Sequence, residues 1–255
     1  YTTTRDSAPY YAPGGAARFN RSSPFVKLWV YRQKLYGLDG LNYVVYDPKK
    51  ELVEEWRAEG KGKIPKGAKL ACVYGDRIVL ARTDEDPHNL HMCARGDAND
   101  WDTAPDILTP LSAFSGNSTG NLHFRANDLV NCLIPARDDL LYIGGDRSFT
   151  RLTGDPGGQG QIDNISQLEG IAFGDAYAVG PSGEVYVKGI NTGIWRIDPA
   201  GSVNLLTEGW IERRMQNLDL SIYDVRMAWS FRQKGLHVYV VPKVTGPRVI
   251  ESFWW

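Results

Sequence analysis

The sequence predicts an all-β protein, and its composition is the first observation behind that prediction. Eight Trp, 13 Tyr and 8 Phe stand beside 27 Gly and 14 Pro. Aromatic residues favour strands, whereas Gly and Pro favour turns. This mixture is typical of short strands joined by many turns, so we expect no long helices.

Strand-sized runs separated by turn residues are the second observation, and they are clearest at 138–156, DDLLYIGGDRSFTRLTGDP. The apolar run Leu140–Ile143 is followed by Gly144-Gly145-Asp146, and a second alternating run ends at Gly154-Asp155-Pro156. This pattern predicts two strands, a tight turn at 144–146 and an exit turn.

A repeat of this unit predicts the architecture. The second strand of each unit begins with Leu35, Ile78, Leu141, Val185 and Leu236, which are 43, 63, 44 and 51 residues apart. Residues 103–127 fit the repeat poorly and are interpreted as a loop insertion; removing about 20 residues there brings every interval to the ~40–50 residues of a propeller blade. We therefore predict a β-propeller with about five visible four-stranded blades, and an irregular β-sandwich stays as the alternative.

The domain organisation follows from where the repeat begins. Residues 1–25 are polar and rich in Pro and Gly, which predicts an N-terminal arm or linker, and 26–255 form the propeller. Whether further residues complete the ring is left open. Residues 51–59 are expected to be β, with a short helix as the alternative, and Trp210–Leu218 is the best helical candidate.

Charge and cysteine usage exclude some classes of function. Lys and Arg number 29 against 30 Asp and Glu, so no overall charge attracts the chain to nucleic acid or to an anionic membrane. Cys72, Cys93 and Cys132 are expected to be buried thiols of a protein made in a reducing cytoplasm. No apolar run approaches the ~20 residues of a membrane span.

No motif predicts catalysis, a cofactor or a metal site. G-x-S-x-G, H-E-x-x-H and the turn signature of sialidase blades do not occur. Arg95-Gly96-Asp97 is interpreted as a turn rather than an adhesive motif, and 154–160 lacks the Lys of a phosphate-binding loop. His88 and His91, with Asp84, Glu85 and Asp86, are interpreted as a solvated acidic turn rather than a metal site.

Several stretches carry a family resemblance: GDRIVLAR and NLHMCARGD, then LLYIGGDRSFTRLTGDP and GGQGQIDNIS, then AVGPSGEVYVKGINTGIWRI, GLHVYVVP and SFWW. Together they resemble a β-propeller module of virion proteins in tailed bacteriophages, over most of residues 26–255. The resemblance implies a structural role, such as the tail nozzle or hub of a short-tailed phage. It offers no catalytic residues to carry over.

The predicted function is therefore that of a non-enzymatic structural component of a phage tail, made in the bacterial host cytoplasm. Its expected partners are copies of itself and other tail proteins, with transient contact to passing DNA left open. A propeller that binds or cleaves glycans for host recognition is the alternative. Aromatic and basic residues outside the blade pattern are the predicted contact residues: Tyr10, Tyr11, Phe114, Arg213, Arg214, Trp254 and Trp255.

Overall fold

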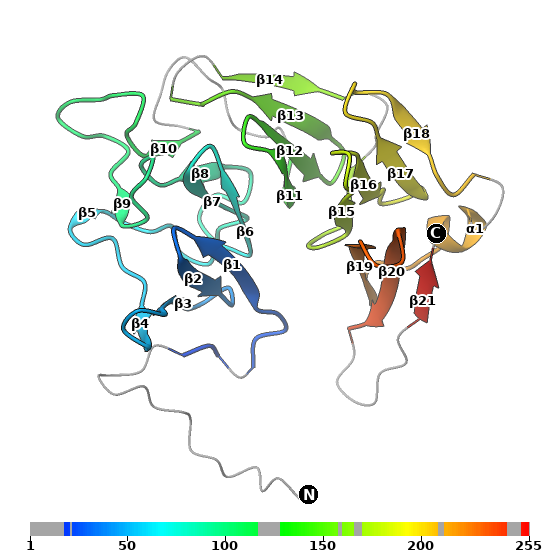
Figure 1. Cartoon of the computed structure of the whole chain (residues 1–255), viewed down its shortest axis with the longest axis horizontal. Helices are drawn as coiled ribbons and strands as arrows, with labels where there is room; N and C mark the ends of the chain where they lie inside the picture. The colour runs from blue at the N-terminus through cyan, green and yellow to red at the C-terminus, as the bar shows by residue number, and fades with distance from the viewer. Residues whose placement is uncertain are drawn as a thin grey trace, which may run out of the picture.

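The chain folds as a β-propeller whose blades follow an arc (Figure 1). The computed structural model describes residues 18–20, 22–116, 128–157, 160–165, 170–208, 212–243 and 251–254. Within these ranges, four antiparallel sheets have four strands and a fifth has three. The predicted fold class is confirmed.

Blades 1 and 2 form the N-terminal half of the arc. Blade 1 contains β1 (Lys27–Tyr31), β2 (Lys34–Leu38), β3 (Tyr43–Asp47) and β4 (Leu52–Glu55), hydrogen-bonded in that order. Blade 2 contains β6 (Leu70–Tyr74), β7 (Arg77–Ala81), β8 (Leu90–Met92) and β10 (Phe114–Ser115). A short parallel pair lies outside the blades and joins β5 (Lys61–Gly62) to β9 (Asp100–Trp101).

Blades 3, 4 and 5 continue the arc with the same up-and-down order. Blade 3 contains β11 (Val130–Arg137), β12 (Leu140–Gly145), β13 (Phe149–Thr153) and β14 (Gln161–Asn164). Blade 4 contains β15 (Tyr177–Val179), β16 (Val185–Lys188), β17 (Ile194–Ile197) and β18 (Val203–Leu205). Blade 5 contains β19 (Tyr223–Ser230), β20 (Gly235–Pro242) and β21 (Glu251–Trp254), and the short helix α1 (Glu212–Gln216) precedes it.

Each pair of consecutive blades encloses a cluster of buried side chains, because neighbouring residues on a strand point to opposite faces of the sheet. On β7, Ile78 and Leu80 pack toward blade 1, whereas Val79 and Ala81 pack toward blade 3. Similar clusters lie between blades 3 and 4 and between blades 4 and 5. Stacking the sheets face to face is therefore what buries the core.

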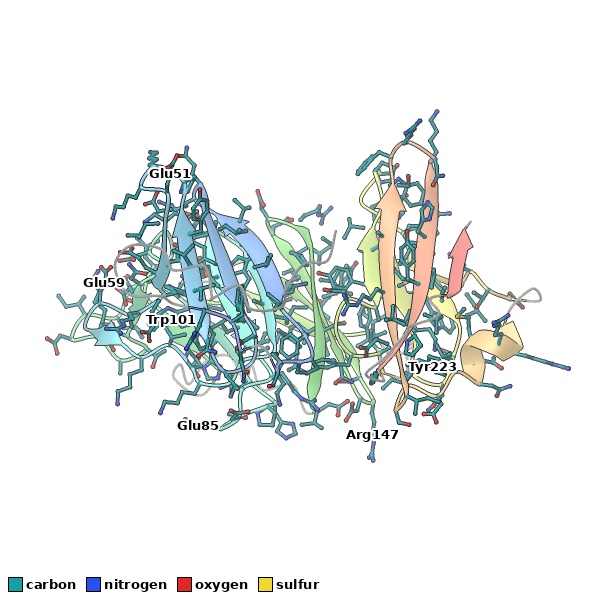
Figure 2. The ribbon with its side chains drawn as sticks, turned by 90° about the horizontal axis from the view of Figure 1, so that it is seen from below. Glu51, Glu59, Glu85, Trp101, Arg147 and Tyr223 are labelled. Carbon is teal, nitrogen blue, oxygen red and sulfur yellow. The ribbon has the colours of Figure 1, made fainter. Side chains whose placement is uncertain are left out.

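The arc has an open side between its first and last blades. The first strands of the five blades, β1, β6, β11, β15 and β19, lie nearest its centre (Figure 1). Figure 2 looks from this open side and shows the blue sheet of blade 1 and the orange sheet of blade 5 standing apart. Within the described ranges, one face of each of these two end blades thus has no neighbouring blade.

The repeat alignment is confirmed, since Leu35, Ile78, Leu141, Val185 and Leu236 all lie in the second strand of their blade. Residues 51–59 contain strand β4, as expected, rather than a helix. The helix predicted over Trp210–Leu218 is present as the shorter α1, with 209–211 outside the described residues.

Two predicted boundaries were wrong. Gly144 and Gly145 end strand β12, and the turn follows at Asp146 and Arg147. The glycine at 144 is required by packing, because a Cβ there would lie 2.6 Å from both Cys132 Sγ and Ile171 Cβ.

The segment predicted as an insertion, 103–127, also supplies a strand. Phe114 and Ser115 form β10, which pairs with β8 and completes the sheet of blade 2. A two-residue strand leaves too short an alternation to be recognised in the sequence. Residues 117–127 lie outside the described ranges.

Candidate functional site

The uncovered face of blade 1 carries a row of apolar side chains that crosses all four strands. Val30 of β1 is opposite Leu35 of β2, Leu35 is opposite Tyr46 of β3, and Tyr46 is opposite Val53 of β4. Residues directly opposite in antiparallel strands share one face of the sheet. We call this row, together with Leu28 of β1, the free face.

Exposure separates the free face from the other face of the same sheet. Leu28 and Val30 are 52% and 67% exposed, whereas Trp29 and Tyr31, which alternate with them, are 9% and 4% exposed. Leu35, Tyr46 and Val53 are half-buried. Strand β1 thus presents apolar residues on both faces, and blade 2 covers only one.

The end of the N-terminal arm lies against part of the free face. A Cβ built on Gly37 would lie 2.5 Å from the Phe19 ring and 2.8 Å from Leu28 Cδ2, so the ring sits over Gly37 beside Leu28. Buried Asp39 anchors this segment, because its carboxylate accepts hydrogen bonds from the Asn20 and Asn42 amides. The arm therefore covers one margin of the face and leaves Val30 exposed.

The uncovered face of blade 5 has different chemistry. On β19, Asp224, Arg226 and Ala228 point away from the core, opposite Val241, Tyr239 and His237 of β20. Asp224 forms an ion pair with Lys243 at 3.4 Å, and His237 stacks on Tyr239. This end of the arc is mostly polar, whereas the free face of blade 1 is apolar.

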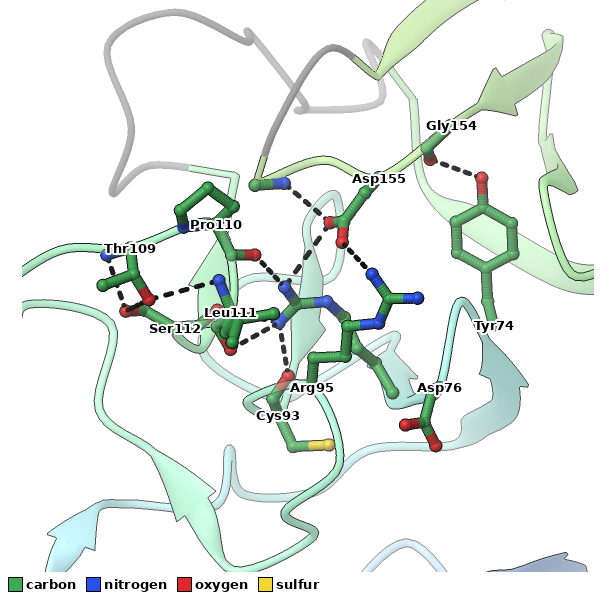
Figure 3. Close-up of polar contacts among 12 residues, drawn as sticks. Tyr74, Asp76, Cys93, Arg95, Thr109, Pro110, Leu111, Ser112, Gly154 and Asp155 are labelled. Atoms are coloured by element: carbon green, nitrogen blue, oxygen red, sulfur yellow. Dashed lines mark hydrogen bonds and ion pairs between the residues drawn. The ribbon is translucent and has the colours of Figure 1, made fainter.

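A buried arginine, Arg77, lies between blades 2 and 3. Figure 3 shows the residues around it, among them Cys93, Pro110, Ser112 and Asp155. The Arg77 side chain is 1% exposed, and its guanidinium donates to the carbonyls of Cys93 (2.9 Å), Ser112 (2.7 Å) and Pro110 (2.5 Å). It also reaches the Asp155 carboxylate at 3.4 Å. The two terminal nitrogens are therefore engaged, so Arg77 holds the chain together rather than binding a substrate.

A pocket of about 260 Å³ adjoins this arginine. The β6–β7 turn, the β11–β12 turn and residues 154–156 line it, with Arg95, Asp138 and Asp139 among the side chains. Arg95 lies 3.7 Å from the Asp155 carboxylate and shares it with Arg77. The two arginines of the pocket therefore share one carboxylate, which ties blade 2 to blade 3.

The centre of the arc joins blade 1 to blade 4. The Lys27 ammonium donates to the Asp175 carboxylate and lies 6.0 Å from the centre of the Tyr177 ring. Burial, with the Asp175 charge nearby, raises the pKa of Tyr177 well above its usual range. The phenol is thus neutral and the lysine is paired, so no unpaired charge from these two residues lies between the inner strands. The described residues give no observation in favour of the glycan alternative.

The cysteines are buried, as predicted. Burial raises the pKa of each thiol, Cys72, Cys93 and Cys132, to about 12, so none is a thiolate at neutral pH. Among the described residues, no group of three or more His, Cys, Asp and Glu side chains is placed to hold a metal ion. No helix in the described ranges has the length and apolar character to cross a membrane.

Arg95-Gly96-Asp97 forms a turn, as interpreted from the sequence. Gly96 has a φ of 83°, and Ala94 and Asp97 form a bridge across it. The Asp97 carboxylate accepts from the Asn99 amide (2.9 Å) and from Lys61 (3.0 Å). These contacts outweigh burial and lower the pKa of Asp97.

The predicted contact residues do not form one site. Arg213 and Arg214 are exposed on α1, at the blade 5 side of the arc. The next residue, Met215, is buried in the cluster between blades 4 and 5. Tyr10, Tyr11 and Trp255 lie outside the described residues, and Trp254 is placed only as the last residue of β21. The role of these residues stays a prediction.

Phe114 requires a correction. Its side chain is 1% exposed and packs in the cluster between blades 2 and 3. Because β10 pairs with β8, the ring is directed into the core, where no partner protein can reach it. The residue belongs to the fold and not to an interface.

Sequence reasoning missed the free face and the buried Arg77. The continuous apolar run Leu28–Tyr31 was a visible signal that both faces of β1 are apolar, because neighbouring residues on a strand point to opposite faces. Arg77 follows a Gly-Asp turn, and such a position is usually exposed. No pattern in the sequence indicated its burial.

Comparisons with known proteins place the fold but not a family. The sequence matches no family model and no curated protein. Among solved structures, the extracellular domains of two hybrid two-component systems from B. thetaiotaomicron superpose on 88% of the chain, both with a TM-score of 0.51, at 12% and 9% identity. A catalytically inactive virginiamycin B lyase from Staphylococcus aureus, solved with quinupristin, matches 96% of the chain at 11% identity, with a TM-score of 0.49.

These likenesses concern the fold alone. The chain covers 26% of each of the two extracellular domains and 72% of the lyase structure. The chain thus spans about a quarter of the length of the structures that it matches first. Its function has to be argued from its own surfaces.

Proposed function

We propose that this chain is a non-catalytic structural propeller that works by binding other protein subunits, as a component of the tail of a bacteriophage virion. The family resemblance in the sequence supports the setting. The free face of blade 1 supports the mode of action, and it is the single observation that carries the proposal.

The free face has the character of an internal blade contact. Its row runs Val30, Leu35, Tyr46 and Val53, and the covered face of blade 1 is likewise built of apolar and aromatic side chains. Burying one Val or Leu side chain stabilises a contact by about 1.5–3 kcal/mol. A protein subunit that covered this face would therefore add to the core that the five blades already share.

The polar groups of the fold are consistent with a structural role. Both terminal nitrogens of Arg77 donate to carbonyls, and the Lys27 ammonium is paired with Asp175. Arg77 links blade 2 to Asp155 of blade 3, and Lys27 links blade 1 to Asp175 of blade 4 across the centre of the arc. In this proposal their task is to keep the blades rigid while subunits bind.

The location is tested by imaging purified phage particles in which this chain carries a small label. We expect the label in the tail, at positions related by rotational symmetry. Infectious particles that contain none of the chain would overturn the virion assignment.

The binding mode is tested in the same particles with Val30→Asp, which places a charge on the free face. We expect particles to lose the labelled protein, while Phe231→Asp, at an equally exposed apolar residue (74%) of the β19–β20 turn, is incorporated normally. Normal incorporation of Val30→Asp would show that assembly does not use this face.

A further inference from the structure

The pocket of about 260 Å³ between blades 2 and 3 contains a buried donor that the fold leaves unpaired. Arg77 lines this pocket although its side chain is 1% exposed. Its terminal nitrogens donate mainly to carbonyls of residues 93 and 110–112, none of which lines the pocket. The third nitrogen, Nε, has no hydrogen-bond partner among the described residues. A buried N–H without an acceptor is unfavourable, so a ligand that accepts from it is stabilised.

A second guanidinium at the same pocket has most of its donors unused. The Arg95 side chain is 49% exposed, and its one ion pair in the described part of the chain joins it to Asp155 at 3.7 Å (Figure 3). This distance exceeds that of a hydrogen bond. Arg77 reaches the same carboxylate at 3.4 Å. One carboxylate thus stands against two guanidinium groups, which leaves the blade 2 side of the pocket positive.

The blade 3 side of the pocket carries the opposite charge. Asp138 and Asp139 form the β11–β12 turn, and both line the pocket. Asp139 pairs with Arg137 at 3.3 Å, whereas Asp138 is exposed and has no ion pair within the described ranges. One carboxylate of this turn is therefore available to a cation.

The rest of the lining is uncharged and consists of Tyr74, Gly75, Gly154 and Pro156. The Tyr74 hydroxyl donates to the Gly154 carbonyl at 2.6 Å. Burial, together with the charges of Asp139 and Asp155, raises the pKa of Tyr74 well above its usual value, so the phenol is neutral at pH 7. A largely apolar wall with a few convergent polar groups is the usual composition of a small-molecule pocket.

We propose that this pocket binds a small zwitterion, a free α-amino acid, that bridges blades 2 and 3. The ligand carboxylate accepts from Arg77 Nε and from the guanidinium of Arg95, whose fork geometry suits two carboxylate oxygens. The ligand ammonium pairs with Asp138. The two ionic groups of the ligand thus take the two sides of the pocket that have opposite charge.

Charge and size favour this class of ligand over a simple ion. Three arginines at the pocket, with Arg137 counted as the partner of Asp139, balance three aspartates: Arg77, Arg95, Arg137, Asp138, Asp139 and Asp155. A simple anion would lie beside unpaired Asp138, and a simple cation would lie beside Arg95, and contact between like charges is unfavourable. The volume lies below the ~300–1,000 Å³ of pockets for drug-sized molecules, so the ligand is small.

The inference goes beyond the proposed function and does not depend on it. A chain that binds no amino acid can still be incorporated into particles through the free face. A chain that is absent from every particle can still bind an amino acid between blades 2 and 3. The two claims therefore fail in different experiments.

Titration of the ¹⁵N-labelled protein with L-alanine at pH 7 tests the class of ligand. We expect saturable shifts of the amide signals of residues 75, 138, 139 and 154, with a Kd of about 1 mM or tighter. N-acetyl-L-alanine lacks the ammonium and L-alaninamide lacks the carboxylate, so each should bind at least about tenfold more weakly. Equal binding of either analogue, or no saturable shift with L-alanine, would overturn the proposal.

Two variants with matched controls test the residues. Arg95→Met removes the partner of the carboxylate and Asp138→Asn removes the partner of the ammonium, and each should weaken L-alanine binding at least about tenfold. Arg95→Lys should lose less, because it keeps the charge.

The controls are Arg151→Met and Asp163→Asn, an exposed pair on blade 3 outside the pocket, and both should bind L-alanine like wild type. Thermal unfolding verifies that every variant is folded. Wild-type affinity in folded Arg95→Met or Asp138→Asn would show that L-alanine binds elsewhere and would overturn the site.

Discussion

On strand β1, Trp29 and Tyr31 point into the cluster shared with blade 2, while Leu28 and Val30 alternate with them and point to the open side of the arc. Both sets are apolar and both are part of a regular antiparallel ladder. They differ in what covers them. This difference shows that blade 1 has a second apolar face that is suited to packing. Among the described residues, the end of the N-terminal arm covers only the margin of this face.

The far end of the arc sharpens this contrast. Blade 5 also has a face without a neighbouring blade, but Asp224, Arg226 and His237 lie there. A face that remains in water is expected to be polar on alternate residues. The face of blade 5 combines these polar residues with Ala228, Tyr239 and Val241, whereas the row Val30, Leu35, Tyr46 and Val53 on blade 1 carries no charge. This contrast is the reason for assigning the subunit contact to blade 1.

The largest expected effect comes from the covered face. Trp56 is 3% exposed, packs against the rings of Trp29, Tyr36 and Trp101, and donates its indole N–H to the Ala98 carbonyl at 3.0 Å. Trp56→Ala should lower the free energy of unfolding by about 3–5 kcal/mol in urea denaturation.

Val30→Ala is the matched change on the free face. In dilute, monomeric protein it should lower the free energy of unfolding by about 0.5 kcal/mol or less, because the side chain is already in solvent. A loss of several kcal/mol would mean that Val30 is covered within the monomer, and the comparison would fail.

A comparable effect is expected at Arg77, because the loop at 109–112 depends on it. Arg77→Met leaves four carbonyls and the Asp155 carboxylate without their donor, and we expect a loss of about 3–5 kcal/mol. Arg77→Lys should recover only part, since an ammonium lacks the fork geometry of a guanidinium. Hydrogen exchange should accelerate at 109–112 in both; unchanged exchange there would contradict the role of Arg77 as the anchor of the loop.

Blade 4 holds a buried lysine, Lys188, and the stability contribution of this residue should respond to pH. The Lys188 ammonium donates to the Thr192 carbonyl (2.7 Å) and the Gly189 carbonyl, and burial lowers its pKa from 10.5 to about 8. Between these values the unfolded chain binds more protons than the folded one, so Lys188 makes stability rise as pH increases from about 8 to 10.5. The full contribution is about 3 kcal/mol.

A comparison with Lys188→Met isolates this contribution from that of the buried cysteines, whose raised pKa values act in the opposite direction above about pH 9. The difference in unfolding free energy between wild type and variant should grow by that amount over the interval. A difference that does not vary with pH would show that Lys188 titrates normally in the folded protein.

A smaller effect than that at Lys188 concerns the arm at the margin of the free face. Burial raises the pKa of Asp39, but hydrogen bonds from the Asn42 and Asn20 amides outweigh it, so the pKa lies below 3.8. Asp39→Asn should cost about 1–2 kcal/mol at pH 7. Because the folded pKa is the lower one, this contribution is present above about pH 4 and is lost as pH falls further.

Hydrogen exchange of the segment around Phe19 reports the same contact. In Asp39→Asn the Asn20 amide should exchange faster at pH 7, while amides of blade 5 stay unchanged. An equal change in both blades would indicate general destabilisation instead of release of the arm.

The repeat could be predicted because each second strand combines alternating apolar residues with flanking turn residues, as at Ile78 and Val185. Strands of two residues, such as β10, gave no such pattern. The pattern predicted Gly144 to be a turn residue, but it lies in strand β12. It is a glycine there because Cys132 and Ile171 leave no room for a Cβ. A single sequence cannot distinguish these two uses of glycine.

The candidate site was harder to predict because it depends on whether a neighbouring blade covers the sheet of blade 1. The continuous apolar run 28–31 marks both faces of β1 as apolar. Which of the two faces is covered depends on where the neighbouring blades lie. The burial of Arg77 depends on carbonyls that lie 33 to 35 residues away in the chain. Aromatic content alone suggested Phe114 as a contact residue, and its ring is in the core.

Thiol labelling at position 30 tests the central claim most directly. The three native cysteines are buried, so Val30→Cys adds one reactive thiol to the free face, and Phe231→Cys adds one at an exposed control site. As protein concentration rises into the range where the chain self-associates, iodoacetamide should label Cys at 30 at least about tenfold more slowly, while labelling at 231 stays constant. Equal and constant rates at both positions, in samples shown by sedimentation to be oligomeric, would contradict the account.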